Sequence, residues 1–140
     1  MRVRIGIATL ALFTIGLVVL AAPAHAATFT VTTTNDVVDP GDGLLSLREA
    51  FAQASSTAGA DVIDLSPAAS YSLTICAPGA LVHTGADALT LQGHGATITQ
   101  TCQNTPILRS DVAAPTFTVD AVTLIGGPNS GVSVNGAGVL

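Results

Sequence analysis

The chain has 140 residues, of which 49% are hydrophobic and only 9% are charged, and its formal net charge is −5 at pH 7. Binding to nucleic acid or to an anionic membrane surface requires clustered cations. The chain contains four basic residues in all, so this composition excludes both classes of partner.

The segment from Met1 to Ala26 has the pattern of a signal peptide. Two early arginines precede an apolar run over residues 5–22, and Ala24-His25-Ala26 offers a small-x-small cleavage site before Ala27. The run is also long enough for a marginal transmembrane helix, but the proline after it and the cleavage site favour a leader that is removed. Removal takes away two of the four arginines, which brings the formal charge from −5 to −7. We therefore expect a secreted or cell-surface protein with no membrane contact after cleavage.

Residues 27–65 are predicted to form an N-terminal cap module made of a strand, a helix and a second strand. Thr28–Thr34 is rich in β-branched residues and alternates in polarity, which is typical of a strand. Turn residues follow it, and Asp61–Leu65 resumes as a strand.

The helix between these strands begins with a capping box. The Ser46 side chain is placed to accept from the backbone N–H of Glu49, and the Glu49 side chain reaches back to the start of the helix. The helix is expected from about Ser46 to Ser55, with Phe51 on its apolar face. We expect this helix to cap one end of a stacked β-structure and to bury Phe51 against the first strands.

Four segments of this module together resemble a known bacterial family. They are Thr30–Asp36, Gly41–Gly43, Ser46–Phe51 and Gly59–Leu65. In this order they are similar to the CSLREA domain, the N-terminal module of bacterial secreted right-handed parallel β-helix proteins. The position that usually holds cysteine in that motif is Leu45 here. The resemblance implies a β-helix fold and a surface location, and it implies no catalytic residue.

An internal repeat follows the cap. Asp87–Gly93 recurs further along the chain as Asp120–Gly126, with five of seven positions identical. Similarity at a fixed offset is typical of stacked repeats. Together with the resemblance, it predicts an all-β, right-handed parallel β-helix (a solenoid) with a short N-terminal capping helix, although the pattern alone leaves a β-sandwich open.

Residues 66–140 are accordingly predicted to be parallel β-helix rungs. The ending Asn135–Leu140 reads as entry into another rung, so we expect the rungs to be truncated. The missing C-terminal rungs of a longer chain are then the natural partner of this end.

Cys76 and Cys102 are the only two cysteines. An even number of cysteines in an exported chain favours a disulfide, and their spacing is close to one predicted turn of the solenoid. The alternative is a pair of free, buried thiols.

Asp87 and Asp120 start the two repeat units, with Asp61 and Asp64 as a weaker echo. If the two carboxylates occupied equivalent places in adjacent rungs they would repel, and a calcium ion would relieve that repulsion. The alternative is that each is a solvated residue that bonds local backbone N–H groups. Calcium is the sole cofactor that the sequence suggests.

No catalytic residue is expected. No serine-nucleophile motif is present, His83 and His94 have no metal-ligand spacing around them, and Arg109 with Asp111 reads as a surface pair. We therefore interpret the chain as an exported, adhesin-like scaffold whose partner is an extracellular surface or polysaccharide. The alternative is the N-terminal part of an extracellular polysaccharide lyase or glycoside hydrolase, with its active residues beyond Leu140.

Overall fold

The computed structural model of the chain describes residues 25–110, 117–127 and 132–134. Residues 1–24, which belong to the predicted leader, lie outside these ranges, as do Asp111 and the ending at 135–140. The predictions made for those parts, and the domain division at residue 65, therefore stay predictions.

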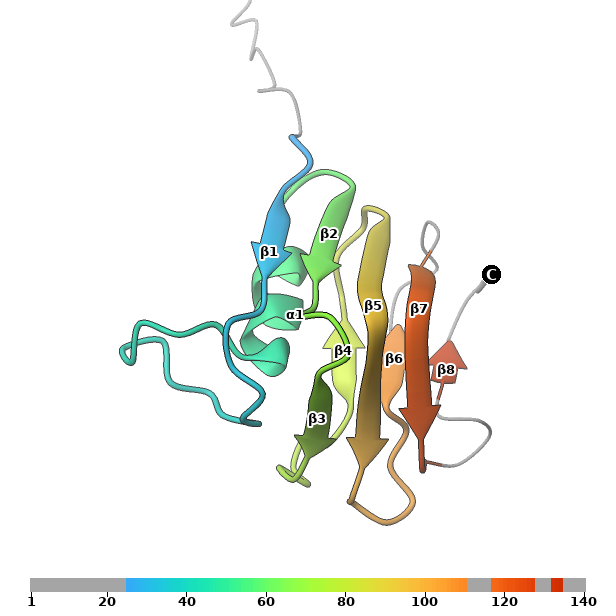
Figure 1. The fold of residues 1–140 in the computed structure, drawn as a ribbon. Coiled ribbons are helices and arrows are strands. Elements are labelled where there is room, and N and C mark those ends of the chain that lie inside the picture. The colour runs from blue at the N-terminus through green and yellow to red at the C-terminus, as the bar shows by residue number, and fades with distance from the viewer. Residues whose placement is uncertain (1–24, 111–116, 128–131, 135–140) are drawn as a thin grey trace, which may run out of the picture.

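Most of the described strands belong to one curled parallel sheet, sheet A (Figure 1). Its centre is the long strand β5 (Leu89–Gln100), which pairs with β2 (Asp61–Asp64) near its start and with β3 (Ser70–Leu73) near its end. On the other side of β5 lies β7 (Phe117–Ile125), and β1 (Thr28–Thr30) extends the sheet beyond β2.

A second parallel sheet, sheet B, is smaller. It contains β4 (Leu81–His83), β6 (Leu108–Ser110) and β8 (Val132–Val134) in that order. Helix α1 (Leu47–Ser56) lies behind β1 and β2 in the view of Figure 1, and it contacts β4 of sheet B as well as β1 and β2 of sheet A. The helix therefore bridges the two sheets.

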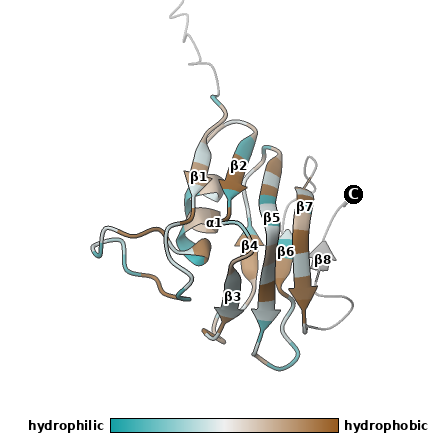
Figure 2. Cartoon of the chain, in the orientation of Figure 1, coloured by the Kyte–Doolittle hydropathy of each residue, from teal (hydrophilic) through white to brown (hydrophobic). Residues whose placement is uncertain are grey.

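Side chains alternate between a buried and a more exposed face along the strands of sheet A. On β5, Leu89, Leu91 and Ile98 are fully buried, whereas the threonines between them are half-buried. Figure 2 shows this period of two as alternating bands along β5. The buried side chains of both sheets and of α1 form one apolar core: Val31, Leu47, Ala50, Phe51, Ala54, Ile63, Leu65, Tyr71, Leu73, Leu81, Leu89, Leu91, Ala96, Ile98, Ile107, Leu108 and Phe117.

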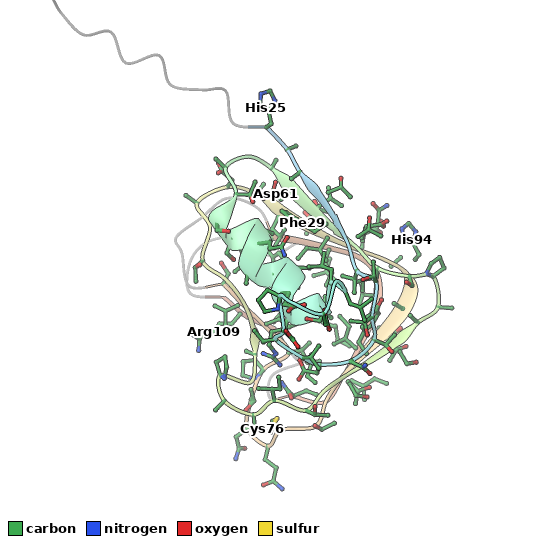
Figure 3. All side chains as sticks on the ribbon, turned by 90° about the vertical axis from the view of Figure 1, so that its left-hand side faces the viewer. His25, Phe29, Asp61, Cys76, His94 and Arg109 are labelled. Atoms are coloured by element: carbon green, nitrogen blue, oxygen red, sulfur yellow. A yellow bond between two sulfur atoms is a disulfide. The ribbon has the colours of Figure 1, made fainter. Side chains whose placement is uncertain are left out.

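The helix predicted from about Ser46 to Ser55 is confirmed as α1, with Ser46 as its N-cap. Both halves of the capping box form: the Glu49 N–H donates to Ser46 Oγ over 3.2 Å, and the Ser46 N–H donates to Glu49 Oε2 over 2.9 Å. Phe51 is 1% exposed and meets the ring of Phe117 edge-on, with ring centroids 6.1 Å apart. Figure 3, turned toward the β1 side, shows α1 lying across this end of the molecule in front of the strands.

The predicted all-β, right-handed parallel β-helix is wrong. The described residues form a small mixed α/β fold, in which a curled parallel sheet, a separate parallel sheet and one helix share a core. The sequence predicted a helix that caps the end of a strand stack and buries Phe51 against the first strands. Phe51 is buried, and with Leu47, Ala50 and Ala54 it belongs to a core that the helix shares with both sheets. The antiparallel β-sandwich that the pattern left open is also excluded, because every described strand pairing is parallel.

The repeat of Asp87–Gly93 at Asp120–Gly126 does not match the strand register. Strands β5 and β7 pair Leu89 with Phe117 and Gln92 with Asp120, so Asp87 and Asp120 are not strand partners. Gly93-His94-Gly95 has the composition of a turn, but β5 runs through this segment, with φ of 49° at His94 and 83° at Gly95. The β5–β7 register shifts there, between Gln92 and Ala96, so the sequence similarity aligned residues that are not strand neighbours.

Candidate functional site

Arg48, which belongs to the Ser46–Phe51 motif at the start of α1, is held by structural contacts. Arg48 Nε donates to Asp36 Oδ1 over 2.7 Å, and its Nη2 donates to Asp36 Oδ2 over 3.0 Å and to the carbonyl of Gly79 over 3.0 Å. Asp36 Oδ2 also accepts from the backbone N–H groups of Thr74 and Ile75. The ion pair therefore joins the loop before α1, the helix and the loop before β4.

The carboxylates of this region are held ionised. Burial acts to raise the pKa of Asp36, but the hydrogen bonds from Arg48 and from the Ile75 and Thr74 N–H groups outweigh it, so the pKa lies below its usual value. The hydrogen bond from the Ser46 backbone N–H lowers the pKa of Glu49 against the opposing effect of burial, and the Ser46 hydroxyl and the Asp39 N–H add to it. Neither group is suited to exchange a proton near neutral pH, which fits a structural role.

Ser55 and His83 form a contact that the sequence did not suggest. His83 is 3% exposed, its Nδ1 lies 3.3 Å from Ser55 Oγ, and its Nε2 lies 3.0 Å from the carbonyl oxygen of Asp87. Its ring also stacks on Phe117. A hydroxyl beside an imidazole resembles a nucleophile with its base. However, with both ring nitrogens engaged and the ring packed in the interior, the arrangement ties the end of α1 to β4.

The two aspartates predicted to hold calcium are in different surroundings. Asp87 lies in the loop between β4 and β5, where its Oδ2 accepts from the backbone N–H of Gly59 over 2.9 Å. Asp120 lies on β7 opposite Gln92, so the two carboxylates do not occupy equivalent positions on neighbouring strands. Over the described ranges, no group of three or more histidine, cysteine, aspartate or glutamate side chains is placed to hold a metal ion.

The predicted disulfide is present. Cys76 and Cys102 are joined, with their Cα atoms 5.4 Å apart. A disulfide indicates an oxidising, extracellular setting. Within the part of the chain that the structure describes, no helix has the length and apolar character needed to cross a bilayer.

The outward-pointing side chains of sheet A form a largely polar surface, which we call the outer face and which includes the apolar Val62 and Ile125. Strand pairing arranges them in four rows. The rows are Thr28, Val62, Thr90 and Thr118; Thr30, Asp64, Gln92 and Asp120; Ser70, Thr97 and Thr123; and Ser72, Thr99 and Ile125. Nine of these fourteen side chains carry hydroxyl groups, and all fourteen are exposed or half-buried. Within a row, neighbouring strands are about 4.8 Å apart.

His94 stands beside the second row of the outer face. Its Nε2 lies 2.7 Å from Asp64 Oδ1, and the two side chains are 42% and 34% exposed. Figure 3 shows His94 pointing away from the body of the molecule. Asp64, Gln92, Asp120 and His94 therefore place planar polar groups among the hydroxyls, where they reach solvent. No sequence pattern indicated the Asp64–His94 pair, because the two residues are 30 positions apart.

An open hollow of about 450 Å³ lies beside the disulfide. Gln100, Thr101, Cys102, Gln103, Asn104 and Gly127 line it. These residues supply amides and a hydroxyl, and neither a carboxylate nor an imidazole is among them. The hollow therefore offers hydrogen bonds but no acid or base.

Comparisons with protein-family models, with curated proteins and with solved structures found no match for this chain. Its function is therefore inferred from its own residues.

Proposed function

We propose that the chain is an exported, adhesin-like scaffold whose outer face binds a neutral extracellular polysaccharide. The observation that carries the proposal is the outer face itself. Rows of hydroxyls surround Asp64, Gln92, Asp120 and His94, whereas the motif residues around Arg48 are buried in structural contacts. Carboxylates accept, amides both donate and accept, and hydroxyls do either, which matches the hydroxyl groups of sugars.

The charge of the chain selects the kind of polysaccharide. The segment from Ala27 onward carries two arginines and nine acidic residues. Asp64 and Asp120 add negative charge to the outer face itself. An anionic polymer is repelled by such a surface, so a neutral polymer is the ligand that fits.

Binding through this face depends on repetition. Each hydrogen bond to a sugar replaces one to water, so a single contact contributes little. A polymer that crosses several rows makes many such contacts at once, and several protein copies on one fibre add avidity. An extended, rigid polysaccharide is therefore a better ligand than a short free sugar.

Export is the second part of the proposal. The pattern of residues 1–26, the disulfide and the resemblance of residues 28–65 to the CSLREA module of bacterial secreted proteins all support it.

Co-sedimentation of the exported full chain with insoluble cellulose, and with a polygalacturonate gel of comparable surface area, tests the function. We expect binding to cellulose and much weaker binding to polygalacturonate. Gln92→Ala on the outer face should weaken binding, whereas Gln53→Ala on the exposed side of α1 is the matched control and should not. Failure to bind any neutral polymer, or equal loss in both variants, would refute the proposal. Release of reducing ends would instead assign the chain to the enzyme class.

A further inference from the structure

Asp61 is a buried carboxylate on the inward-facing, mostly apolar side of sheet A. Asp61 is the first residue of β2. Its side chain points inward, and its strand neighbours in register are Leu89 of β5 and, beyond it, Phe117 of β7. Its exposed fraction is 2%. A carboxylate taken out of water in this way is costly unless it is paired and fully hydrogen-bonded.

The hydrogen bonds of Asp61 are incomplete. Its Oδ1 accepts from the backbone N–H of Ala27 over 2.8 Å. Its Oδ2 is buried and has no hydrogen-bond partner within the described part of the chain. The whole chain contains no lysine, since its four basic residues are Arg2, Arg4, Arg48 and Arg109, and Arg48 is already paired with Asp36. A buried carboxylate is expected to be paired with a cation, whereas the partner of Asp61 is a single uncharged peptide N–H.

The neighbouring backbone fixes Ala27 in this position. The Ala27 carbonyl accepts from the Val62 N–H over 2.8 Å, which continues the β1–β2 pairing by one residue. His25 and Ala26 are exposed, and Figure 3 shows His25 outside the body of the fold, beyond the end of the sheet where Asp61 lies. The carbonyl of Ala27 is thus held by β2, and its nitrogen faces Asp61.

We propose that the chain is cleaved between Ala26 and Ala27, and that the new α-ammonium group of Ala27 forms a buried ion pair with Asp61. The inference rests on the proposed export, since a signal peptidase of the exporting cell makes the cut. Water adds across the amide bond: the C–N bond breaks, Ala26 leaves with a carboxylate, and Ala27 keeps its nitrogen as an ammonium. One of its three N–H groups retains the bond to Oδ1, and the others supply donors for Oδ2.

Processing then completes the fold as well as removing the leader. In the uncut chain the amide nitrogen has a single N–H and no charge, so Oδ2 stays without a partner. In the cut chain a cation meets the buried anion. Loss of the leader is therefore coupled to the stability of the sheet edge formed by β1 and β2.

The absence of lysine makes the test selective, because the α-amino group is the sole primary amine of the processed protein. The full chain is exported from a bacterial host, and the intact mass after reduction gives its first residue. The purified protein is then treated with an amine-selective acetylating reagent at neutral pH, and mass spectrometry follows the rate. Asp61→Asn is the test variant, and Asp42→Asn in the exposed turn is the control with the same change of charge.

We expect the mature protein to begin at Ala27. Its amine should react roughly tenfold more slowly than in Asp61→Asn, because the buried carboxylate favours the protonated, unreactive form of the amine. Asp42→Asn should react as the wild type does. Equal rates in wild type and Asp61→Asn would overturn the ion pair. An exported protein that begins elsewhere would overturn it and leave export standing, whereas retention in the cell with the leader attached would overturn both.

A second measurement covers the case in which Asp61→Asn does not fold. Wild-type protein is acetylated while unfolded in urea with its disulfide intact, refolded and compared with untreated protein. We expect the acetylated form to unfold at a lower urea concentration, because it has lost the cation. Identical unfolding curves would contradict the proposal without any variant.

Discussion

Arg48 and Asp36 are twelve residues apart, and they meet in two parallel hydrogen bonds of 2.7 and 3.0 Å, with side chains that are 8% and 2% exposed. This two-bond geometry fixes both side chains and is the strong form of an arginine–carboxylate contact. The arginine of the motif is therefore a structural residue that holds the loop before α1 against the loop before β4.

Removing one partner of this pair should destabilise the protein strongly. Asp36→Ala leaves the Arg48 charge buried without its counter-ion and also leaves the Thr74 and Ile75 N–H groups unbonded. We expect a loss of about 3–5 kcal/mol in the free energy of unfolding, measured by urea denaturation. Asp42→Ala in the exposed turn is the control and should cost far less. A loss below about 1 kcal/mol for Asp36→Ala would show that the pair is not buried in solution.

Stability should fall in acid. The pKa values of Asp36 and Glu49 are lowered in the folded protein from reference values of 3.8 and 4.5. Between the folded and unfolded pKa values the unfolded state binds more protons, so stability rises with pH there. The contribution of both groups is complete above the unfolded values and is lost as the pH falls below them through the folded values. Urea midpoints measured from pH 6 down to pH 3 should therefore decrease.

The variant Glu49→Gln isolates one part of this acid effect. It keeps an acceptor for the Ser46 N–H but cannot titrate, so its stability should depend less on pH over the same range. If Glu49→Gln has the same pH dependence as the wild type, protonation of Glu49 does not contribute to the loss of stability in acid.

The Cys76–Cys102 disulfide should contribute substantially to stability. It closes a loop with a sequence separation of 26 residues. Chain-entropy arguments give about 3–4 kcal/mol for a loop of this size. The double variant Cys76→Ser/Cys102→Ser should lose about this amount in urea denaturation. Alkylation of two thiols in the exported protein without reductant would instead show that the bridge does not form.

Phe51 should be the most sensitive side chain of α1. It is 1% exposed, and its ring packs edge-on against Phe117. We expect Phe51→Ala to cost about 3–5 kcal/mol in the free energy of unfolding. Gln53→Ala, two residues along on the exposed side of the same helix, should cost little. A small loss for Phe51→Ala would mean that α1 does not pack against the core.

The helix and the disulfide of this fold could be predicted from the sequence, whereas the pairing register of the strands could not. The Ser46–Glu49 capping box depends on residues three apart, and the helix followed from it. The disulfide followed from a count of two cysteines in a chain with a leader-like start. Both signals are contained in a short stretch or in the composition.

The pairing register of the strands in sheet A could not be predicted from a short stretch of sequence or from the composition. Asp87 and Asp120 look equivalent because the residues after them are similar, yet β5 passes through Gly93–Gly95 and carries Gln92 opposite Asp120. Gly93 and Gly95 have the pattern of a turn in the sequence. In the structure, β5 pairs with β7 both before and after them, so the strand continues through a bulge. The Asp64–His94 pair depends on that same register, which explains why the sequence did not suggest it.

The most direct test of the outer face as a binding surface is chemical-shift mapping by NMR. The ¹⁵N-labelled exported protein is titrated with a neutral cello-oligosaccharide long enough to cross several strands. We predict that the shifted amides concentrate on Thr90, Gln92, Thr97 and Thr99 of β5 and on the strands beside them. Shifts confined to the hollow at Gln100–Asn104, or no shifts with any neutral oligosaccharide, would contradict the proposed function.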